Sequence, residues 1–170
     1  MALLAIRDTE KFTIQVDFRK KILDKRAVLF VDDEEITLQS LQRNLNDEVY
    51  DKYYAKSGKE ALEILRQKEV HVIVVDIVMP GMDGLELLKI VDKEYPKVVS
   101  IALSGFEQPI DVITTMYGEG VYKFISKSLT LDEDLRKIIR QAINNYDLQS
   151  EHEEMVAELE HCSGRKTSTE

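Results

Sequence analysis

A nearly continuous apolar run from Val70 to Val75 constrains the fold of this chain more than any other segment. The run is rich in β-branched residues, and it ends in a carboxylate, Asp76, and a turn that contains Pro80 and Gly81. Such a run, bounded by turn residues, is typical of a strand buried on both faces of a parallel sheet. Asp76 would then lie at the carboxyl end of the strand, where open α/β sheets hold their ligands.

Strand and helix patterns alternate along most of the chain. Four further strands are predicted at 27–31, 50–56, 98–103 and 121–125. Helices with one apolar face are expected to begin near residues 34, 57, 84, 109 and 131. Five strand–helix pairs with short connections predict a doubly wound parallel sheet with helices on both faces. The more polar strand at 50–56 is expected near an edge of this sheet.

The two ends of the chain differ from this alternating pattern, so we divide it into 1–25, 26–148 and 149–170. Alternation of apolar and polar residues at 12–18 predicts a half-buried strand, either in a structural arm or at the cut end of a preceding domain. The last helix is expected to extend past residue 148 and to finish in a disordered tail from Ser163. A coiled coil is one interpretation, with the seam Leu135, Ile138, Ala142, Asn145, Gln149, His152, Val156 and Leu159.

Charge and cysteine content limit the classes of function. The net charge of −9 argues against unaided binding to nucleic acids or anionic membranes, since both need a basic surface. The single cysteine, Cys162, cannot form an internal disulfide, which favours a reducing cytoplasm. The apolar start is too short for a membrane span and lacks the basic residues of a signal peptide. We therefore expect a cytoplasmic protein.

Ionisable and hydroxyl side chains follow four of the predicted strands: Asp32 and Asp33, Asp76, Ser104, and Lys127. Because the carboxyl ends of parallel strands lie at one edge of a sheet, these side chains can converge. Three crowded carboxylates repel one another and should have raised pKa values unless a cation lies among them. Their oxygens suit a hard divalent ion such as Mg²⁺. With a lysine and a hydroxyl opposite, the set suits phosphoryl transfer onto a carboxylate.

In these segments the chain closely resembles the receiver domain of bacterial two-component response regulators. The matching pieces are Val28–Glu34, Val75–Gly84, Leu103–Gly105 and Phe124–Lys127, and the resemblance covers about residues 26–148. It implies a flavodoxin-like, five-stranded (βα)5 fold. The segment Gly118–Lys127 further resembles receivers found ahead of cyclic-dinucleotide phosphodiesterase or transcriptional output modules.

The resemblance also implies a role for each residue of the acidic set. Asp76 would accept a phosphoryl group from a sensor histidine kinase or a histidine phosphotransfer protein. Asp33 would bind Mg²⁺ or Mn²⁺ directly, with Asp32 and the backbone carbonyl of Val78 completing the metal site. Lys127 would pair with the phosphoryl group.

Two further residues are implied to carry the switch. Ser104 would hydrogen-bond the phosphoryl group, and Phe124 would turn inward as Ser104 moves. This motion would alter the face made by the fourth helix, the fifth strand and the fifth helix. That face could bind an output domain, a downstream protein or a second copy in a homodimer.

Ser128 and Phe124 depart from the family pattern. Phe124 stands in place of a tyrosine, so it keeps the ring but lacks the hydroxyl. Ser128 stands where the family has a proline after the lysine, so we expect a trans peptide bond there, because a non-proline cis bond costs roughly 3–4 kcal/mol. Val78 and Phe106 occupy positions that tune the lifetime of the phosphoryl group. Both are apolar and cannot orient an attacking water, so we expect a comparatively long-lived aspartyl phosphate.

Two other functions fit the sequence less well than a phosphorylatable receiver, which is not expected to turn over a substrate. A haloacid-dehalogenase-like phosphatase needs a second aspartate two residues after its nucleophile, and Val78 stands there. A receiver-like scaffold that is never phosphorylated would not need the acidic set and the lysine. Neither a dinucleotide-binding nor a P-loop glycine motif is present.

Overall fold

The computed structural model describes residues 26–105, 121–127 and 133–163. The predictions for the strand at 12–18, the helix at 109–117, Phe106 and Ser128 lie outside these residues. The structure therefore does not test the predicted strand of the N-terminal arm or the peptide bond before Ser128.

The described strands form one parallel sheet of five, in the order β2-β1-β3-β4-β5. The predicted five-stranded doubly wound fold is confirmed, and the polar strand lies at an edge as expected. Both ends of every strand lie within two residues of the predicted limits. The strands are β1 (Ala27–Val31), β2 (Asp51–Ala55), β3 (Val72–Asp76), β4 (Val99–Ser104) and β5 (Lys123–Ser126).

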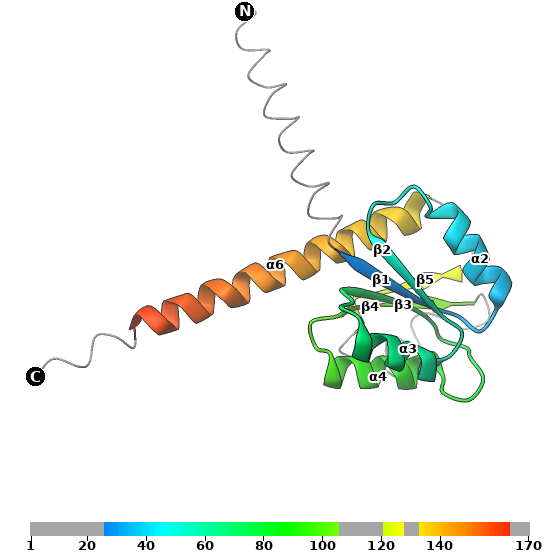
Figure 1. The fold of residues 1–170 in the computed structure, drawn as a ribbon, viewed down its shortest axis with the longest axis horizontal. Helices are drawn as coiled ribbons and strands as arrows, with labels where there is room; N and C mark the ends of the chain where they lie inside the picture. Colours follow the sequence, from blue (N-terminus) through cyan, green and yellow to red (C-terminus); the bar gives the residue numbers. More distant parts are fainter. Residues whose placement is uncertain (1–25, 106–120, 128–132, 164–170) are drawn as a thin grey trace, which may run out of the picture.

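Helices cover both faces of the sheet (Figure 1). Apolar side chains of α2 (Glu35–Asn44) and α6 (Glu133–Ser163) pack on one face. Those of α3 (Gly58–Gln67) and α4 (Gly84–Glu94) pack on the other. The sheet is therefore enclosed between two separate apolar cores, which explains why its central strands carry apolar residues at successive positions.

Every residue of β1 and β3 is buried, as the continuous apolar runs predicted. One detail of that prediction was wrong: β3 begins at Val72, so Val70 and His71 precede the strand. Both are nevertheless buried. Nδ1 of the His71 ring accepts a hydrogen bond from the backbone N–H of Ala27 at 3.0 Å. A side chain, and not a backbone carbonyl, is therefore the acceptor for this N–H of β1.

Local signals in the sequence explain where α3 and α4 begin. Ser57 caps α3 by accepting from the N–H of Glu60 at 3.2 Å. Asp83 caps α4 in the same way, accepting from the N–H of Glu86 at 2.7 Å. The next residue, Gly84, donates its N–H to the carbonyl of Ile77 at 2.9 Å, which holds the start of α4 against the end of β3.

Helix α6 is the longest element, and its second half projects beyond the sheet (Figure 1). The expected helical extension is present, and the helix ends at Ser163, the residue from which a disordered tail is expected. The predicted coiled-coil seam is wrong in its first part, because Leu135, Ile138 and Ala142 are buried in the core of their own domain. No helix in the described part of the chain is both long and apolar enough to span a bilayer.

Candidate functional site

The chain changes direction across the sheet between β1 and β3. From β1 it goes to the edge strand β2, and from β3 it continues to β4 and β5 on the other side. Open α/β sheets form a crevice at such a switch point, beyond the carboxyl ends of the strands. Asp32 and Asp33 follow β1, and Asp76 is the last residue of β3, so three carboxylates lie at this crevice.

The three carboxylates converge as predicted. One oxygen from each of Asp32, Asp33 and Asp76 lies within 4.8 Å of the others. Asp32 and Asp76 are buried, whereas Asp33 is exposed. A ring of carboxylate oxygens, open to solvent on one side, fits a hard divalent ion that keeps some of its water ligands. These residues therefore suit Mg²⁺ or Mn²⁺, and Asp33 offers the most accessible ligand.

Lys127 reaches the same carboxylates from the loop that follows β5. Its Nζ lies 2.8 Å from Oδ2 of Asp76 and 3.0 Å from Oδ2 of Asp32. Oε2 of Glu34 lies further from Nζ of Lys127, at 3.9 Å. One ammonium group therefore bridges the two buried carboxylates, and the side chains predicted from β1, β3 and the end of β5 are brought together.

Burial and charge act in opposite directions on these side chains. Burial raises the pKa of Asp32, and the bond from the N–H of Glu34 at 2.9 Å together with Lys127 lowers it only in part. Burial also raises the pKa of Asp76, again opposed by Lys127, and the charge of Asp32 raises it further. The raised pKa values were expected from mutual repulsion. Burial is instead the largest cause, because both side chains lie below the surface.

The loop after β3 places Val78 beside the carboxylate of Asp76. The N–H of Val78 donates to Oδ1 of Asp76 at 3.3 Å, which orients the carboxylate. Val78 is 62% exposed, and its side chain has no atom that could form a hydrogen bond at the site. Gly81, further along the loop, adopts a positive φ of 81°, which suits glycine and lets the chain turn towards α4.

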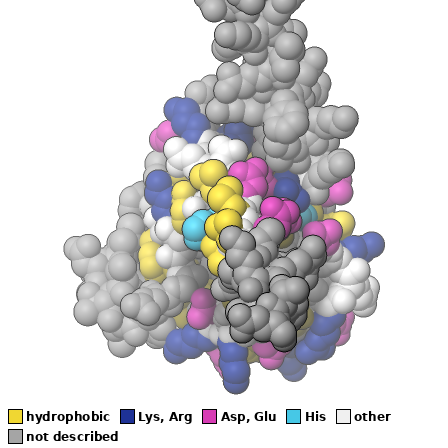
Figure 2. All heavy atoms as spheres, turned by 90° about the vertical axis from the view of Figure 1, so that its left-hand side faces the viewer, with side chains coloured by type: hydrophobic (Ala, Val, Ile, Leu, Met, Phe, Trp, Pro, Cys, Tyr) yellow, Lys and Arg dark blue, Asp and Glu magenta, His cyan; other side chains and the backbone are white. Residues whose placement is uncertain are grey.

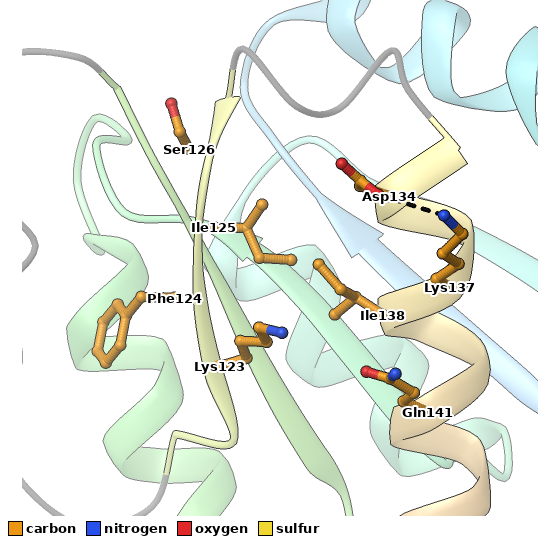
Figure 3. Close-up of a pocket in the computed structure, with 8 residues that line it drawn as sticks. All are labelled: Lys123, Phe124, Ile125, Ser126, Asp134, Lys137, Ile138 and Gln141. Carbon is orange, nitrogen blue, oxygen red and sulfur yellow. Dashed lines mark ion pairs between the residues drawn. The ribbon is translucent and has the colours of Figure 1, made fainter.

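The two predicted switch residues lie on the neighbouring strands β4 and β5. Ser104, the last residue of β4, is buried, and its Oγ donates to the carbonyl of the next residue, Gly105, at 3.0 Å. Phe124 is half-buried against the core on the α3 and α4 side. Figure 3 shows its ring on the opposite side of β5 from Ile125, which faces α6.

A pocket of about 410 Å³ lies along β5 and the first turns of α6 (Figure 3). It does not include the acidic site. Lys137 and Asp134, both on α6, form an ion pair of 3.6 Å at its rim. The residues that line the pocket are Lys123, Phe124, Ile125, Ser126, Asp134, Lys137, Ile138 and Gln141. It belongs to the face on which the resemblance places the switch.

Two polar clusters between α6 and the rest of the domain were not predicted. At one, Arg140 and Arg136 pair with the buried carboxylate of Glu48, with closest distances of 2.8 and 3.3 Å. At the other, Arg26 pairs with Asp147 at 2.7 Å. The partners in each pair lie far apart in sequence, so no local pattern could have found them.

Comparison with known proteins agrees with this geometry. A model of the response regulator receiver domain family matches residues 28–154. The hydrogenase transcriptional regulatory protein HoxA of Cupriavidus necator is 36% identical over 137 residues, which are 80% of this chain. The match covers 28% of HoxA, so the chain spans little more than a quarter of that relative.

Solved structures give the same result. A signal receiver domain of an HD domain-containing protein from Pseudomonas fluorescens is 30% identical, with a TM-score of 0.66. The match covers 72% of this chain and 98% of that domain. NtrX from Brucella abortus is 25% identical with a TM-score of 0.69, and the match covers 77% of this chain and 29% of NtrX.

Proposed function

The chain belongs to the response regulator receiver domain family, and from this membership we propose that it is a switch phosphorylated on Asp76. The phosphoryl donor is a sensor histidine kinase or a histidine phosphotransfer protein, and the protein acts in the cytoplasm. Its chemistry is limited to gaining and losing this phosphoryl group, without turnover of a metabolite. The observation that carries the proposal is the convergence of Asp32, Asp33 and Asp76 with Lys127 at one crevice.

The acidic set fits a divalent ion, because three carboxylate oxygens meet within 4.8 Å and one of the residues is exposed. Asp33, Asp32 and the backbone carbonyl of Val78 would hold Mg²⁺ or Mn²⁺, together with Asp76. When bound, the ion neutralises charge on the phosphoryl oxygens. Without that neutralisation, a phosphate dianion would meet three carboxylates at short range.

Asp76 is the nucleophile in this proposal. One of its carboxylate oxygens bonds to phosphorus while the bond between phosphorus and the donor's imidazole nitrogen breaks. The hydrogen bond from the N–H of Val78 holds Oδ1 in a fixed orientation. Lys127, now 2.8 Å from Oδ2 of Asp76, is close enough to transfer its ion pair to an oxygen of the attached phosphoryl group.

Phosphorylation would be transmitted through Ser104 and Phe124. The hydroxyl of Ser104 would leave the carbonyl of Gly105 and donate to the phosphoryl group, which frees space beneath the loop. Phe124 would then turn inward, and the surface along β5 and α6 would change. That surface would bind an output domain, a downstream protein or a second copy, and HoxA, a transcriptional regulator, is an example of a longer relative.

Incubation with Mg²⁺ and a small phosphodonor tests the proposal. Intact-mass analysis should show one added phosphoryl group on the wild-type chain and none on the Asp76→Asn variant. Asp92→Asn is the matched control, because Asp92 is an exposed carboxylate on α4 and should leave the modification unchanged. Beryllofluoride should bind the wild type and the Asp92→Asn variant but not Asp76→Asn.

The alternatives give different outcomes in the same assay. A chain that takes up no phosphoryl group from any donor, although it is folded and binds Mg²⁺, would be a receiver-like scaffold. Continuous release of phosphate from a phosphorylated metabolite would identify a phosphatase with an aspartate nucleophile.

We further propose that the aspartyl phosphate is comparatively long-lived. Val78 is exposed next to Asp76 but has no polar atom in its side chain that could orient an attacking water. Phosphorylated Val78→Asn and Val78→Glu variants should lose their label faster than the wild type. Rapid loss from the wild type, unchanged by either substitution, would contradict the proposal.

A further inference from the structure

The second half of α6 presents a row of apolar side chains to solvent. Leu148 and Leu159 are each 65% exposed and Met155 is 60% exposed, and their spacing places them on one side of the helix. Figure 2 looks towards this end of the molecule and shows hydrophobic side chains gathered beside a histidine, with acidic side chains next to them. Clustered apolar side chains at a surface commonly mark an interaction site. Nothing in the described part of the chain covers this apolar row.

A row of acidic side chains runs along α6 beside the apolar row. Its members recur at intervals of four, three and four residues and therefore share one side of the helix: Asp147, Glu151, Glu154 and Glu158. The three glutamates are exposed. Residues 141–164 contain neither lysine nor arginine, so this stretch of chain offers the glutamates no partner of opposite charge.

The chain enters the domain at the first carboxylate of the acidic row. Arg26, the residue before β1, pairs with Asp147 at 2.7 Å, and its guanidinium lies over the ring of Tyr146, 5.2 Å from the centroid. Glu153, on the side of α6 that faces the domain, pairs with Lys97 at 2.7 Å. These contacts set the rotation of α6. They also attach the segment 1–25 to the domain where the uncovered half of the helix begins.

The sequence of the segment 1–25 complements this surface. Residues 19–25 contain four lysines or arginines and one aspartate, although the whole chain has a net charge of −9. Ahead of them, apolar side chains stand at every second position: Phe12, Ile14, Val16 and Phe18. The basic part is nearest to Arg26 and so meets the acidic row first. The apolar part is next along the chain and meets the apolar row.

The segment is also long enough to cover both rows. At about 1.5 Å of rise per residue, the surface from Asp147 to Leu159 is about 18 Å long. At roughly 3.3 Å per residue, residues 12–25 span up to about 43 Å when extended. Because the segment is tethered beside the surface, its effective concentration there is on the order of millimolar. We propose that residues 12–25 dock on the second half of α6 of the same chain.

Limited trypsin digestion of the full chain, without phosphorylation, tests the docking. The initial rate of cleavage within residues 19–25 tracks the fraction of molecules with an undocked segment. Met155→Gln combined with Leu159→Gln removes two side chains from the apolar row and should raise this rate at least about fivefold. Ala157→Gln, at an exposed position on the opposite side of α6, should leave the rate unchanged. Glutamine adds no tryptic site and is a good helix former, so circular dichroism should show equal helix content.

A second pair of variants tests the acidic row. Glu151→Gln with Glu158→Gln removes two carboxylates and should also raise the cleavage rate within 19–25. Glu63→Gln with Glu94→Gln removes the same charge from exposed positions on α3 and α4 and should leave the rate unchanged. The difference between the two pairs should shrink as salt is added, because salt screens exposed charges.

Carbodiimide crosslinking tests which chain covers α6. The reagent joins a lysine to a carboxylate in contact with it, through an amide bond and without a spacer. Docking therefore predicts links from Lys20 or Lys21 to the glutamates of the acidic row. In an equal mixture of unlabelled and ¹⁵N-labelled protein, each linked pair of peptides should be wholly unlabelled or wholly labelled.

Linked peptides of mixed isotope composition would place a second copy on α6 and overturn the proposal. The absence of any crosslink between residues 12–25 and α6 would overturn it as well. So would digestion rates that are equal for the paired substitutions on α6 and for their controls.

Discussion

Replacing Gly84 by alanine should damage both the fold and the acidic site, because the start of α4 lies directly on the end of β3. A Cβ at position 84 would lie 2.0 Å from the carbonyl oxygen of Asp76 and 2.8 Å from the Cα of Ile77. An ordinary contact needs 3.4 Å, so α4 and β3 would have to separate by about 1.4 Å, the difference between 3.4 and 2.0 Å. The atoms in the way belong to the backbone, so no side-chain rotation can relieve the clash.

The energetic cost follows from this overlap. Forcing an extra carbon into a well-packed region typically costs 1–3 kcal/mol, and alanine regains at most about 1 kcal/mol from its higher helix propensity. Because the overlap is with backbone atoms, we take the upper end of this range, about 3 kcal/mol, and expect a net loss of about 2 kcal/mol in the free energy of unfolding for Gly84→Ala. With a urea slope of about 1.5 kcal/mol/M, the unfolding midpoint should fall by about 1.3 M. Because the Asp76 backbone moves, Mg²⁺ affinity should fall too.

Other glycines provide matched controls for the same substitution. At Gly105 a Cβ would meet nothing within 4 Å, so Gly105→Ala should change stability by no more than about 0.5 kcal/mol. At Gly58 it would lie 2.6 Å from the sulfur of Met82, which is a flexible side chain that can rotate away, so the loss should be smaller than at Gly84. If Gly84→Ala matched Gly105→Ala in both urea midpoint and Mg²⁺ affinity, the close approach would have no energetic consequence and the reasoning would fail.

Three further predictions concern charge and protonation. Burial raises the pKa of folded Asp76 above its ordinary value of 3.8, so its ionised form disfavours the folded state. In the absence of metal, Asp76→Asn should therefore unfold at higher urea than the wild type at neutral pH, and this gain should vanish as the pH falls below 3.8. Mg²⁺ at about 100 times its dissociation constant should stabilise the wild type by about 2.7 kcal/mol, and Asp33→Asn should lose most of this shift in thermal melts. Burial and the charge of Arg26 lower the pKa of His71 below its ordinary value of 6.5, so wild-type stability should fall as the pH drops through 6.5 and below. His71→Asn should remove this fall while keeping an acceptor for the Ala27 N–H, whereas His71→Leu should cost about 1–3 kcal/mol at neutral pH.

Each of these predictions has a clear contrary result. Equal urea midpoints for Asp76→Asn and the wild type at neutral pH would mean that Lys127 fully offsets the cost of burying the carboxylate. A Mg²⁺-dependent melting shift that survives Asp33→Asn would place the ion elsewhere. A pH profile of stability that is identical for His71→Asn and the wild type would show that His71 does not titrate in the transition.

The sequence by itself determined the layers of the fold and the members of the acidic site. Continuous apolar runs predicted the buried central strands, and parallel pairing then required Asp32, Asp76 and Lys127 to meet at one edge. That inference needed no side-chain geometry, because all carboxyl ends of a parallel sheet lie together. Capping residues such as Ser57 likewise set a helix start through hydrogen bonds within one turn.

Tertiary structure decided how those residues are protonated and which way α6 faces. Burial raises the pKa of Asp76 more than repulsion does, because the domain covers its carboxylate. No local sequence pattern indicates that degree of burial. The pairing of Arg26 with Asp147 joins residues 121 positions apart. It holds the polar face of α6 against the domain, so the apolar residues from Leu148 onward point outward. The sequence shows which residues of the second half of α6 are apolar, but the rotation of the helix, which leaves them facing solvent, comes from long-range contacts.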